Sequence, residues 1–303
     1  APVVIDDGSN ELWRPVNSSG DFLGPMRLRN ALARSRNLVT IRVLREVGLN
    51  QTIEFLQGFG FDESRLPHGL SLALGSASLT PLEMTSAYAV LANGGFKVSP
   101  WFIERVSKGE TLVEETLTTV ACRECSPGQE EVIFDGDRHP VAERVVDPIN
   151  LYILRDMLRD VIENGTGRRA LELDREDIVG KTGTTNGQRD TWFAGFNSDL
   201  VTTVWLGKDD NTTTAEYGAN AALPIWIAFM GQALDGKPLA MPEAPDELVT
   251  ARVDPGTGRR VSRGGISELF HPDHLPEQQS RRVERAVEQQ SGSQGTGAYE
   301  AIF

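Results

Sequence analysis

The hydrophobic period of the sequence changes from helical to strand-like near residue 177, and this change limits the fold more than any other feature. Ahead of it, apolar residues recur at helical spacing in residues 25–33 and 38–47 and in helices that start at Thr80 and at Asp147. After it come three runs rich in β-branched and aromatic residues: residues 177–184, 191–196 and 200–206. Helices followed by three consecutive strands predict an α+β fold, in which an antiparallel sheet is packed by helices.

The clearest helix start lies at Thr80. This threonine is suited to cap the helix, Pro81 to occupy its first position, and Glu83 to complete a capping box. Asn93 and the two glycines after it end the helix. A further apolar helix is expected at residues 223–234, where it would return across the sheet.

The chain is expected to consist of a main domain and an extension, since 303 residues suffice for about two domains. We assign residues 1–240 to the main domain, interrupted by a surface insertion at residues 104–144, in which charged residues mix with Thr, Gly and Pro. Pro and Gly recur in the C-terminal extension, residues 241–303. Within it, residues 276–297 are rich in Gln, Ser, Arg and Glu and are predicted to be weakly ordered.

The insertion contains both cysteines of the chain, Cys122 and Cys125. A four-cysteine zinc site needs a second pair, and no βαβ pattern supports a thioredoxin-like redox role. A small loop disulfide, or two thiols without a chemical role, is the favoured interpretation.

The charge balance excludes several classes of partner. The chain has 43 acidic and 30 basic residues, a net charge of −13, and an acidic surface repels phosphate backbones and anionic lipids. No dense basic patch offsets this charge, so no nucleic-acid partner is expected. The longest nearly unbroken apolar run, residues 221–230, is far shorter than the ~20 residues that span a bilayer.

Several catalytic and cofactor motifs are absent from the sequence. No histidine lies in an H-E-x-x-H motif and no G-x-S-x-G is present, so neither a metal site nor a Ser-His-Asp hydrolase is expected. Residues 180–182, Gly-Lys-Thr, resemble the end of a phosphate-binding loop, but Arg175 stands where that loop needs glycine. Nucleotide binding is therefore rejected, and no cofactor is predicted.

Two short motifs remain as candidates for chemistry: K-T-G-T at residues 181–184, at the end of a predicted strand, and S-R-N at residues 35–37, between two predicted helices. A glycine at a strand edge allows a substrate peptide to lie along the backbone, and threonine hydroxyls hold a carboxylate. A lysine beside a Ser-Asn pair is able to relay protons. Alone, however, each triplet is more often an ordinary turn than a site.

Together with their neighbours, these motifs resemble the transpeptidase domain of class A penicillin-binding proteins, most closely the 1A type of Gram-negative bacteria. The matching segments follow the family's order from about residue 1 to residue 237. They are Trp13-Arg14-Pro15, Gly24-Pro25, Ser35-Arg36-Asn37-Leu38-Val39, Leu72-Ala73-Leu74-Gly75, Thr80-Pro81-Leu82-Glu83, Ala92-Asn93-Gly94-Gly95, Gly165-Thr166-Gly167, Lys181-Thr182-Gly183-Thr184-Thr185, Asp190-Thr191-Trp192-Phe193 and Trp205-Leu206-Gly207. The resemblance implies a penicillin-binding-protein/β-lactamase-like fold.

The resemblance further implies acyl transfer on peptidoglycan stem peptides that end in D-Ala-D-Ala, with β-lactams as mimics of that end. By the family pattern, Ser35 and Lys181 relay a proton toward the leaving amine, and Asn37 hydrogen-bonds the substrate backbone. The substrate-binding residues that it implies are Thr182, Gly183 and Thr184. The two threonines receive the terminal carboxylate, and the backbone N–H of the second is one oxyanion-hole donor.

The nucleophile motif of the family, S-x-x-K, is absent from the sequence. The residues three positions before the five lysines are Gly94, Arg105, Ile178, Trp205 and Leu234, and none is serine. In the family this motif precedes S-x-N, as do a glycosyltransferase domain and a membrane anchor. We therefore expect the C-terminal part of a bifunctional cell-wall synthase of the periplasmic face of the bacterial inner membrane, incomplete at its N-terminus and inactive alone. Its expected partners are its own missing N-terminal part and, where the family uses one, an activator in the periplasm or outer membrane.

Two other functions stay open at the level of sequence. One is a non-catalytic module that binds peptidoglycan peptides, and the other is a relative of serine D,D-carboxypeptidases and β-lactamases. Such relatives hydrolyse where a transpeptidase cross-links, and both reactions use the same residues. An S-x-x-K motif upstream of this sequence would favour the synthase.

Overall fold

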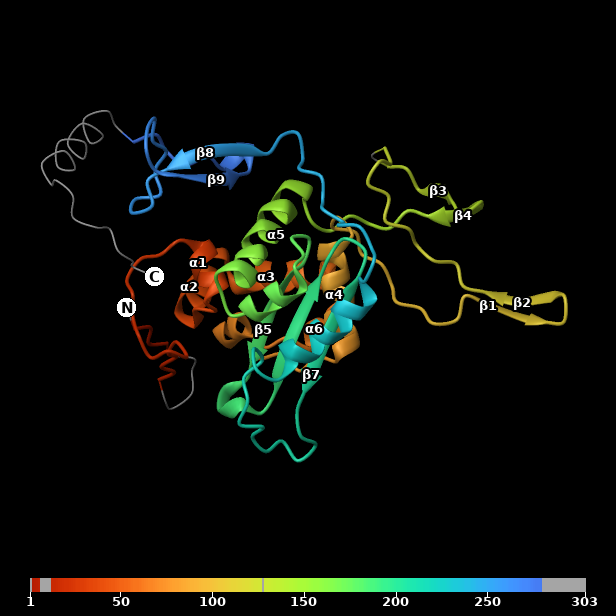
Figure 1. The fold of residues 1–303 in the computed structure, drawn as a ribbon, viewed down its shortest axis with the longest axis horizontal. Coiled ribbons are helices and arrows are strands. Elements are labelled where there is room, and N and C mark those ends of the chain that lie inside the picture. The colour runs from red at the N-terminus through yellow and green to blue at the C-terminus, as the bar shows by residue number, and fades with distance from the viewer. Residues whose placement is uncertain (1, 6–11, 127, 280–303) are drawn as a thin grey trace, which may run out of the picture. The chain divides into compact units, whose positions relative to one another are not determined.

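The computed structural model describes residues 2–5, 12–126 and 128–279, which belong to two compact units, Ala1–Ala244 and Pro245–Phe303 (Figure 1). The helices are α1 (Leu28–Ala33), α2 (Asn37–Val47), α3 (Leu49–Gly58), α4 (Pro81–Ala92), α5 (Pro148–Glu163) and α6 (Ala222–Ala233), with short 3₁₀ turns between them. The strands are β1 (Arg105–Lys108), β2 (Thr111–Glu115), β3 (Glu131–Phe134), β4 (Asp137–Pro140), β5 (Val179–Thr184), β6 (Thr191–Phe196), β7 (Val201–Leu206), β8 (Val249–Val253) and β9 (Ile266–Phe270).

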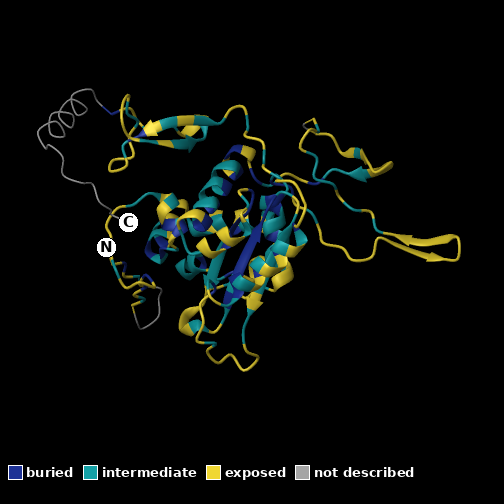
Figure 2. Ribbon diagram, viewed as in Figure 1, coloured by how far each residue is buried: buried dark blue, intermediate teal, exposed yellow. Residues whose placement is uncertain are grey.

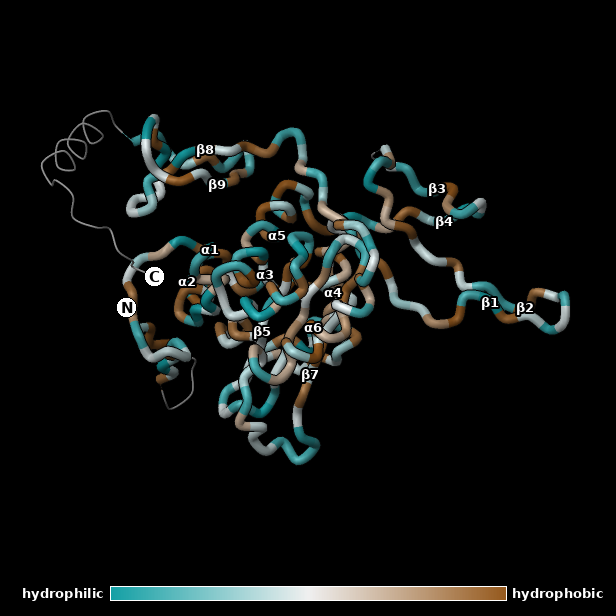
Figure 3. The backbone as a smooth tube through the Cα atoms, in the orientation of Figure 1, coloured by the Kyte–Doolittle hydropathy of each residue, from teal (hydrophilic) through white to brown (hydrophobic). Residues whose placement is uncertain are grey.

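The centre of the first unit is the antiparallel sheet β5-β6-β7, as the change of period predicts. The turn between β6 and β7 is built by Asn197, whose side-chain oxygen accepts hydrogen bonds from the backbone N–H groups of Asp199 (3.0 Å) and Leu200 (2.8 Å). The middle strand β6 is the most buried of the three (Figure 2). The connection from β7 to α6 is hydrophilic at its tip (Figure 3).

Helices cover both faces of this sheet. Phe193 and Phe196 lie three residues apart on β6, so their side chains point to opposite faces. Phe193 packs against Trp226 of α6, with ring centroids 4.9 Å apart, whereas Phe196 packs against Tyr88 of α4 in a cluster that α5 completes. Gly195 makes room for the indole of Trp226, since a Cβ there would lie 2.7 Å from its ring. The sheet is thus the middle layer, with α6 on one side and α4 and α5 on the other.

The N-terminal helices form smaller cores beside the sheet. The first begins at Leu28, later than the periodicity predicts, because the residue before it is extended. Gly48 ends α2 as expected, with φ of 98°, but α3 follows at once and was not predicted. Its Ile53 is buried with Leu44 of α2 in one cluster. Gly48 therefore forms a sharp turn between two helices that pack against each other.

A buried carboxylate fixes the start of β5. Asp177 forms an ion pair with Arg175 (2.8 Å) and accepts hydrogen bonds from the Asn197 side chain (3.0 Å) and the Ala240 backbone N–H (2.9 Å). Burial would raise the pKa of this carboxyl, but the hydrogen bonds from Arg175, Ala240 and Asn197 outweigh it and lower the pKa to about 2. The segment after α6 is thereby tied to the sheet.

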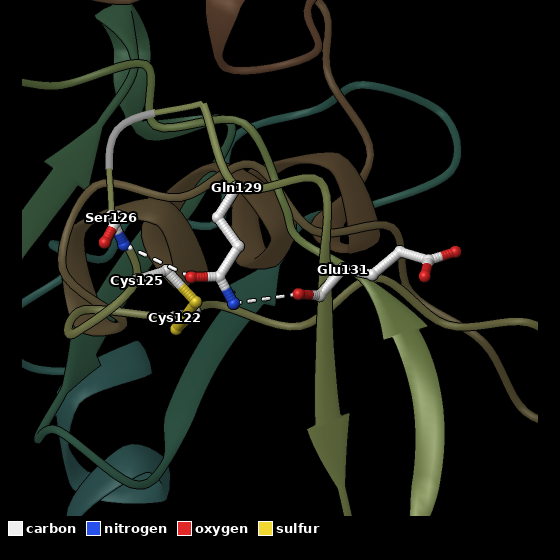
Figure 4. The surroundings of a disulfide bond; sticks show 5 residues. All are labelled: Cys122, Cys125, Ser126, Gln129 and Glu131. Atoms are coloured by element: carbon white, nitrogen blue, oxygen red, sulfur yellow. Dashed lines mark hydrogen bonds between the residues drawn. A yellow bond between two sulfur atoms is a disulfide. The ribbon is translucent and has the colours of Figure 1, made fainter.

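The predicted insertion forms two hairpins, β1-β2 and β3-β4, whose residues are mostly exposed. Between them, Cys122 and Cys125 form a disulfide (Figure 4), which excludes the idle thiols and the zinc half-site. Arg123, inside the four-residue loop, donates to the carbonyls of Asn93 (3.1 Å) and Ala92 (3.3 Å). The disulfide loop therefore caps the C-terminal end of α4, where carbonyl groups lack helical partners.

The second unit contains the antiparallel hairpin β8-β9. The sequence did not predict these strands, and residues 280–297 of the stretch predicted to be weakly ordered lie outside the described residues. Among the described residues, no helix is both long and apolar enough to cross a membrane.

Candidate active site

Ser35 lies in the break between α1 and α2 and adopts a left-handed backbone conformation, with φ of 52°. This conformation is uncommon for residues other than glycine. It is held by two backbone hydrogen bonds, from Ser35 N–H to the Leu32 carbonyl (3.1 Å) and from Arg36 N–H to the Ala31 carbonyl (2.9 Å). Arg36 is buried and forms an ion pair with Asp21. The turn thus presents the Ser35 hydroxyl in a fixed direction.

Lys181 reaches this hydroxyl from β5. Its Nζ donates hydrogen bonds to Ser35 Oγ and to the Thr182 carbonyl, each at 2.9 Å. Burial lowers the pKa of the ammonium from 10.5 to about 8. At this pKa about a tenth of the side chain is neutral at pH 7, so the group can both accept and donate a proton near neutrality.

β5 is an edge strand of the described sheet, paired with β6 on one side. The ladder continues with a hydrogen bond from Thr185 N–H to the Asp190 carbonyl (3.1 Å). Because backbone groups alternate along an antiparallel ladder, those of Lys181 and Gly183 point to β6, and those of Thr182 and Thr184 point to the open edge. An extended peptide can add to such an edge through backbone hydrogen bonds.

The threonines of β5 are held by different neighbours. Thr182 Oγ1 lies 2.7 Å from Thr166 Oγ1, a hydrogen bond in which either hydroxyl can donate. Thr184 Oγ1 accepts a hydrogen bond from the backbone N–H of Gly218 (3.0 Å). Gly183 lies opposite Trp192, and a Cβ on it would come within 3.0 Å of the tryptophan Cβ.

Asn37 is the first residue of α2, and its side-chain Nδ2 donates to the Val16 carbonyl (2.9 Å). Lys181 thus contacts Ser35 directly and is followed in the chain by Thr182. The Asn37 side chain is instead bonded to the segment that precedes α1.

A hollow of about 320 Å³ opens beside Ser35, lined by residues 17–19, 34–36 and 164–166. In the described part of the chain, no group of three His, Cys, Asp or Glu side chains could hold a metal ion.

Sequence reasoning gave no role to Thr166, although it noted the Gly165-Thr166-Gly167 motif. The sequence signal for this residue is the pair of glycines that flank a threonine just after a predicted helix, a pattern that indicates close backbone packing. A Cβ on Gly165 would lie 2.2 Å from the Ala33 carbonyl oxygen, so only glycine allows this close approach.

Three comparisons with known proteins place the chain among its relatives. The family model described as the penicillin binding protein transpeptidase domain matches residues 4–230. Penicillin-binding protein 1A of Pseudomonas aeruginosa is 43% identical over 317 aligned positions, covering 91% of this chain and 38% of the relative. The protein of that name from Vibrio cholerae is 36% identical, covering 88% of this chain and 36% of the relative.

Two solved structures also match the chain in fold. The crystal structure of penicillin-binding protein 1A from Haemophilus influenzae matches with a TM-score of 0.85 and 36% identity, over 92% of this chain and 45% of that one. The D,D-transpeptidase domain of a peptidoglycan glycosyltransferase from Eggerthella lenta has a TM-score of 0.56 at 19% identity, over 78% of this chain and 59% of that one, and is similar in fold. The chain thus spans less than half the length of the 1A relatives named here.

Proposed function

The chain belongs to the penicillin-binding protein transpeptidase family, and from this membership we propose that it supplies most of the catalytic domain of a serine D,D-transpeptidase that cross-links peptidoglycan. The substrate is a stem peptide ending in D-Ala-D-Ala, and β-lactams bind as its mimics. The whole protein is a bifunctional glycosyltransferase and transpeptidase, anchored at the periplasmic face of the inner membrane. The observation that carries the proposal is the contact of Lys181 Nζ with Ser35 Oγ beside an open strand edge.

In the first half-reaction, a serine hydroxyl attacks the carbonyl of the penultimate D-Ala. An ester forms as the serine hydroxyl loses its proton, the C–N bond to the terminal D-Ala breaks, and the leaving amine gains a proton, so the half-reaction consumes no net proton. We assign this proton to the Lys181 ammonium, relayed through the Ser35 hydroxyl over their 2.9 Å contact. The lowered pKa of Lys181 supports this role, because a group near its pKa both gives up and regains a proton readily.

The substrate lies along the open edge of β5 in this proposal. The Thr184 backbone N–H points to that edge and serves as one donor to the oxyanion. Removing one such donor typically costs about 3 kcal/mol of transition-state stabilisation. The hydroxyls of Thr182 and Thr184 receive the terminal carboxylate. Asn37, with its Nδ2 held by the Val16 carbonyl, offers Oδ1 to an N–H of the substrate backbone.

The nucleophilic serine comes from polypeptide outside these 303 residues, because no serine stands three positions before any lysine of the sequence. In the second half-reaction, an amine of a neighbouring stem peptide attacks the ester and loses a proton as the cross-link forms. The ester C–O bond breaks, and the released serine oxygen takes up a proton. The domain boundary at about residue 240, with an insertion at residues 104–144, belongs to the same proposal.

A fluorescent penicillin tests the proposal on three samples: the complete gene product, the 303-residue chain, and the complete product with Lys181→Met. We expect a stoichiometric covalent band for the complete product, none for the chain alone, and a strongly reduced band for the variant. An unlabelled complete product would refute the transpeptidase proposal, and a label on the chain alone would refute the external nucleophile. A D-Ala-D-Ala peptide offered with an acceptor amine then separates cross-linking from hydrolysis by the product formed.

A further inference from the structure

Thr166 contacts both motif-bearing segments of the site. It follows α5, which packs against α1 and β5 (Figure 1). Its backbone N–H donates to the Ala33 carbonyl (3.1 Å), two residues before Ser35. Its hydroxyl lies 2.7 Å from the hydroxyl of Thr182 on β5. One residue therefore links the Ser35 turn to the strand that ends in K-T-G-T.

The backbone around Thr166 allows little movement. Gly165 passes so close to the Ala33 carbonyl that a Cβ would lie 2.2 Å from its oxygen. On the other side, the Gly167 N–H donates to the Val161 carbonyl (2.9 Å), and a Cβ there would lie 3.0 Å from Ile162 Cδ1. The two glycines thus fix the peptide units on either side of Thr166, and its side chain is aimed by the backbone.

The direction of the hydrogen bond between the two threonines determines what Thr182 offers a ligand. A hydroxyl has one proton, and a carboxylate only accepts hydrogen bonds. If Thr182 donated to Thr166, it would turn lone pairs toward a carboxylate. If Thr166 donates instead, Thr182 accepts that bond and points its own proton at the ligand. Donors in such a chain polarise one another, which strengthens the bond to an anion.

We infer that Thr166 is a positioning residue, which donates to Thr182 and so orients the Thr182 hydroxyl toward the carboxylate of the substrate or of a β-lactam. The inference rests on the proposed function and adds a residue to it. The contribution of Thr166 is larger for a charged acceptor, because a carboxylate oxygen accepts a stronger hydrogen bond from the Thr182 hydroxyl than a neutral ester carbonyl does. A purely structural threonine would show no such dependence on the ligand.

The test uses the complete gene product and two ligands, a penicillin and its methyl ester, whose second-order acylation rates are measured separately. Thr166→Val keeps the branched shape and removes the donor. We expect the rate with the free acid to fall roughly 2- to 12-fold, the effect of one neutral hydrogen bond, and the rate with the ester to fall by less, so that the acid-to-ester ratio decreases. Thr166→Ser keeps the hydroxyl and should restore the acid rate.

Thr85→Val is the matched control, since Thr85 is also half-buried with its hydroxyl bonded, here to the Pro81 carbonyl of its own helix (2.7 Å). The acid-to-ester ratio is taken within each variant, so partial unfolding lowers both rates and leaves the ratio unchanged. An unchanged ratio in Thr166→Val would overturn the inference, whether or not both rates fall. Absence of acylation in the wild type would instead count against the proposed function.

Discussion

Replacing Lys181 by methionine is expected to change how stability depends on pH. Burial lowers the pKa of this ammonium from 10.5 to about 8. Each pKa unit corresponds to about 1.4 kcal/mol, so burying the charged form destabilises the folded state by about 3 kcal/mol below pH 8. Between pH 8 and 10.5 the unfolded chain binds more protons at this site, and the folded state therefore gains stability as pH rises through that interval. The variant lacks this gain.

The structure also gives the size of the change at neutral pH. The substitution removes hydrogen bonds to Ser35 Oγ and the Thr182 carbonyl, each contributing about 1 kcal/mol. It also removes the unfavourable burial of charge, about 3 kcal/mol. At pH 7 we therefore expect Lys181→Met to be as stable as the wild type or about 1 kcal/mol more stable, although it deletes a residue that the proposed reaction needs.

Urea unfolding followed by tryptophan fluorescence at pH 7 and pH 10 measures the effect on the 303-residue chain. The free energy of unfolding of the wild type, relative to Lys181→Met, should rise by about 2–3 kcal/mol between the two pH values. Lys208→Met is the control, because the Lys208 side chain is exposed and stays in water when the chain folds. Equal pH dependence of the wild type and Lys181→Met would refute the reasoning, since it would mean that Lys181 remains hydrated in the folded state.

Two further predictions concern the ties around the site. The pKa of Asp177 is about 2, below its usual 3.8, so its contribution of about 2 kcal/mol to the free energy of unfolding should be present above pH 4 and disappear as pH falls toward 2. At pH 7, Asp177→Asn should lower the free energy of unfolding by about 3 kcal/mol, because Arg175 is left without its charge partner. If the stability of this variant still fell with acid as in the wild type, the prediction would be contradicted. Replacing Cys122 and Cys125 together by serine should release Arg123 from the end of α4 and speed backbone hydrogen exchange in residues 120–126 several-fold, as measured by mass spectrometry. Unchanged exchange would show that the loop keeps its conformation without the disulfide.

Regular, locally determined elements were predictable from the sequence. The structure confirms the capping box of α4, with Thr80 and Glu83 bonded reciprocally, and the Asp147 cap of α5. Both signals act within four residues and need no partner from elsewhere. The hairpins β1-β2 and β3-β4 were missed because their side chains are largely exposed, and strands with little burial lack an alternating pattern.

The site was less predictable, because its geometry joins distant segments. The motif at Lys181 marked a strand end, but the 2.9 Å contact to Ser35 spans 146 positions in the chain. Family resemblance suggested that these two residues work together, and the fold supplies the contact. Thr166 escaped assignment because its importance arises from two partners, Ala33 and Thr182, on segments that only the folded chain brings together.

An open strand edge such as that of β5 is also a surface on which copies of a protein can pair. Backbone N–H and C=O groups on an unpaired edge bind any extended chain, and the same edge of another copy qualifies as readily as a peptide. Two features limit such self-pairing: the strand has only six residues, and the positive charge of Lys181 lies beside the edge. In the proposed function, the backbone N–H groups of Thr182 and Thr184 that would hold a stem peptide are the same groups that pairing with another copy would use, so substrate affinity and resistance to self-pairing depend on the same few atoms.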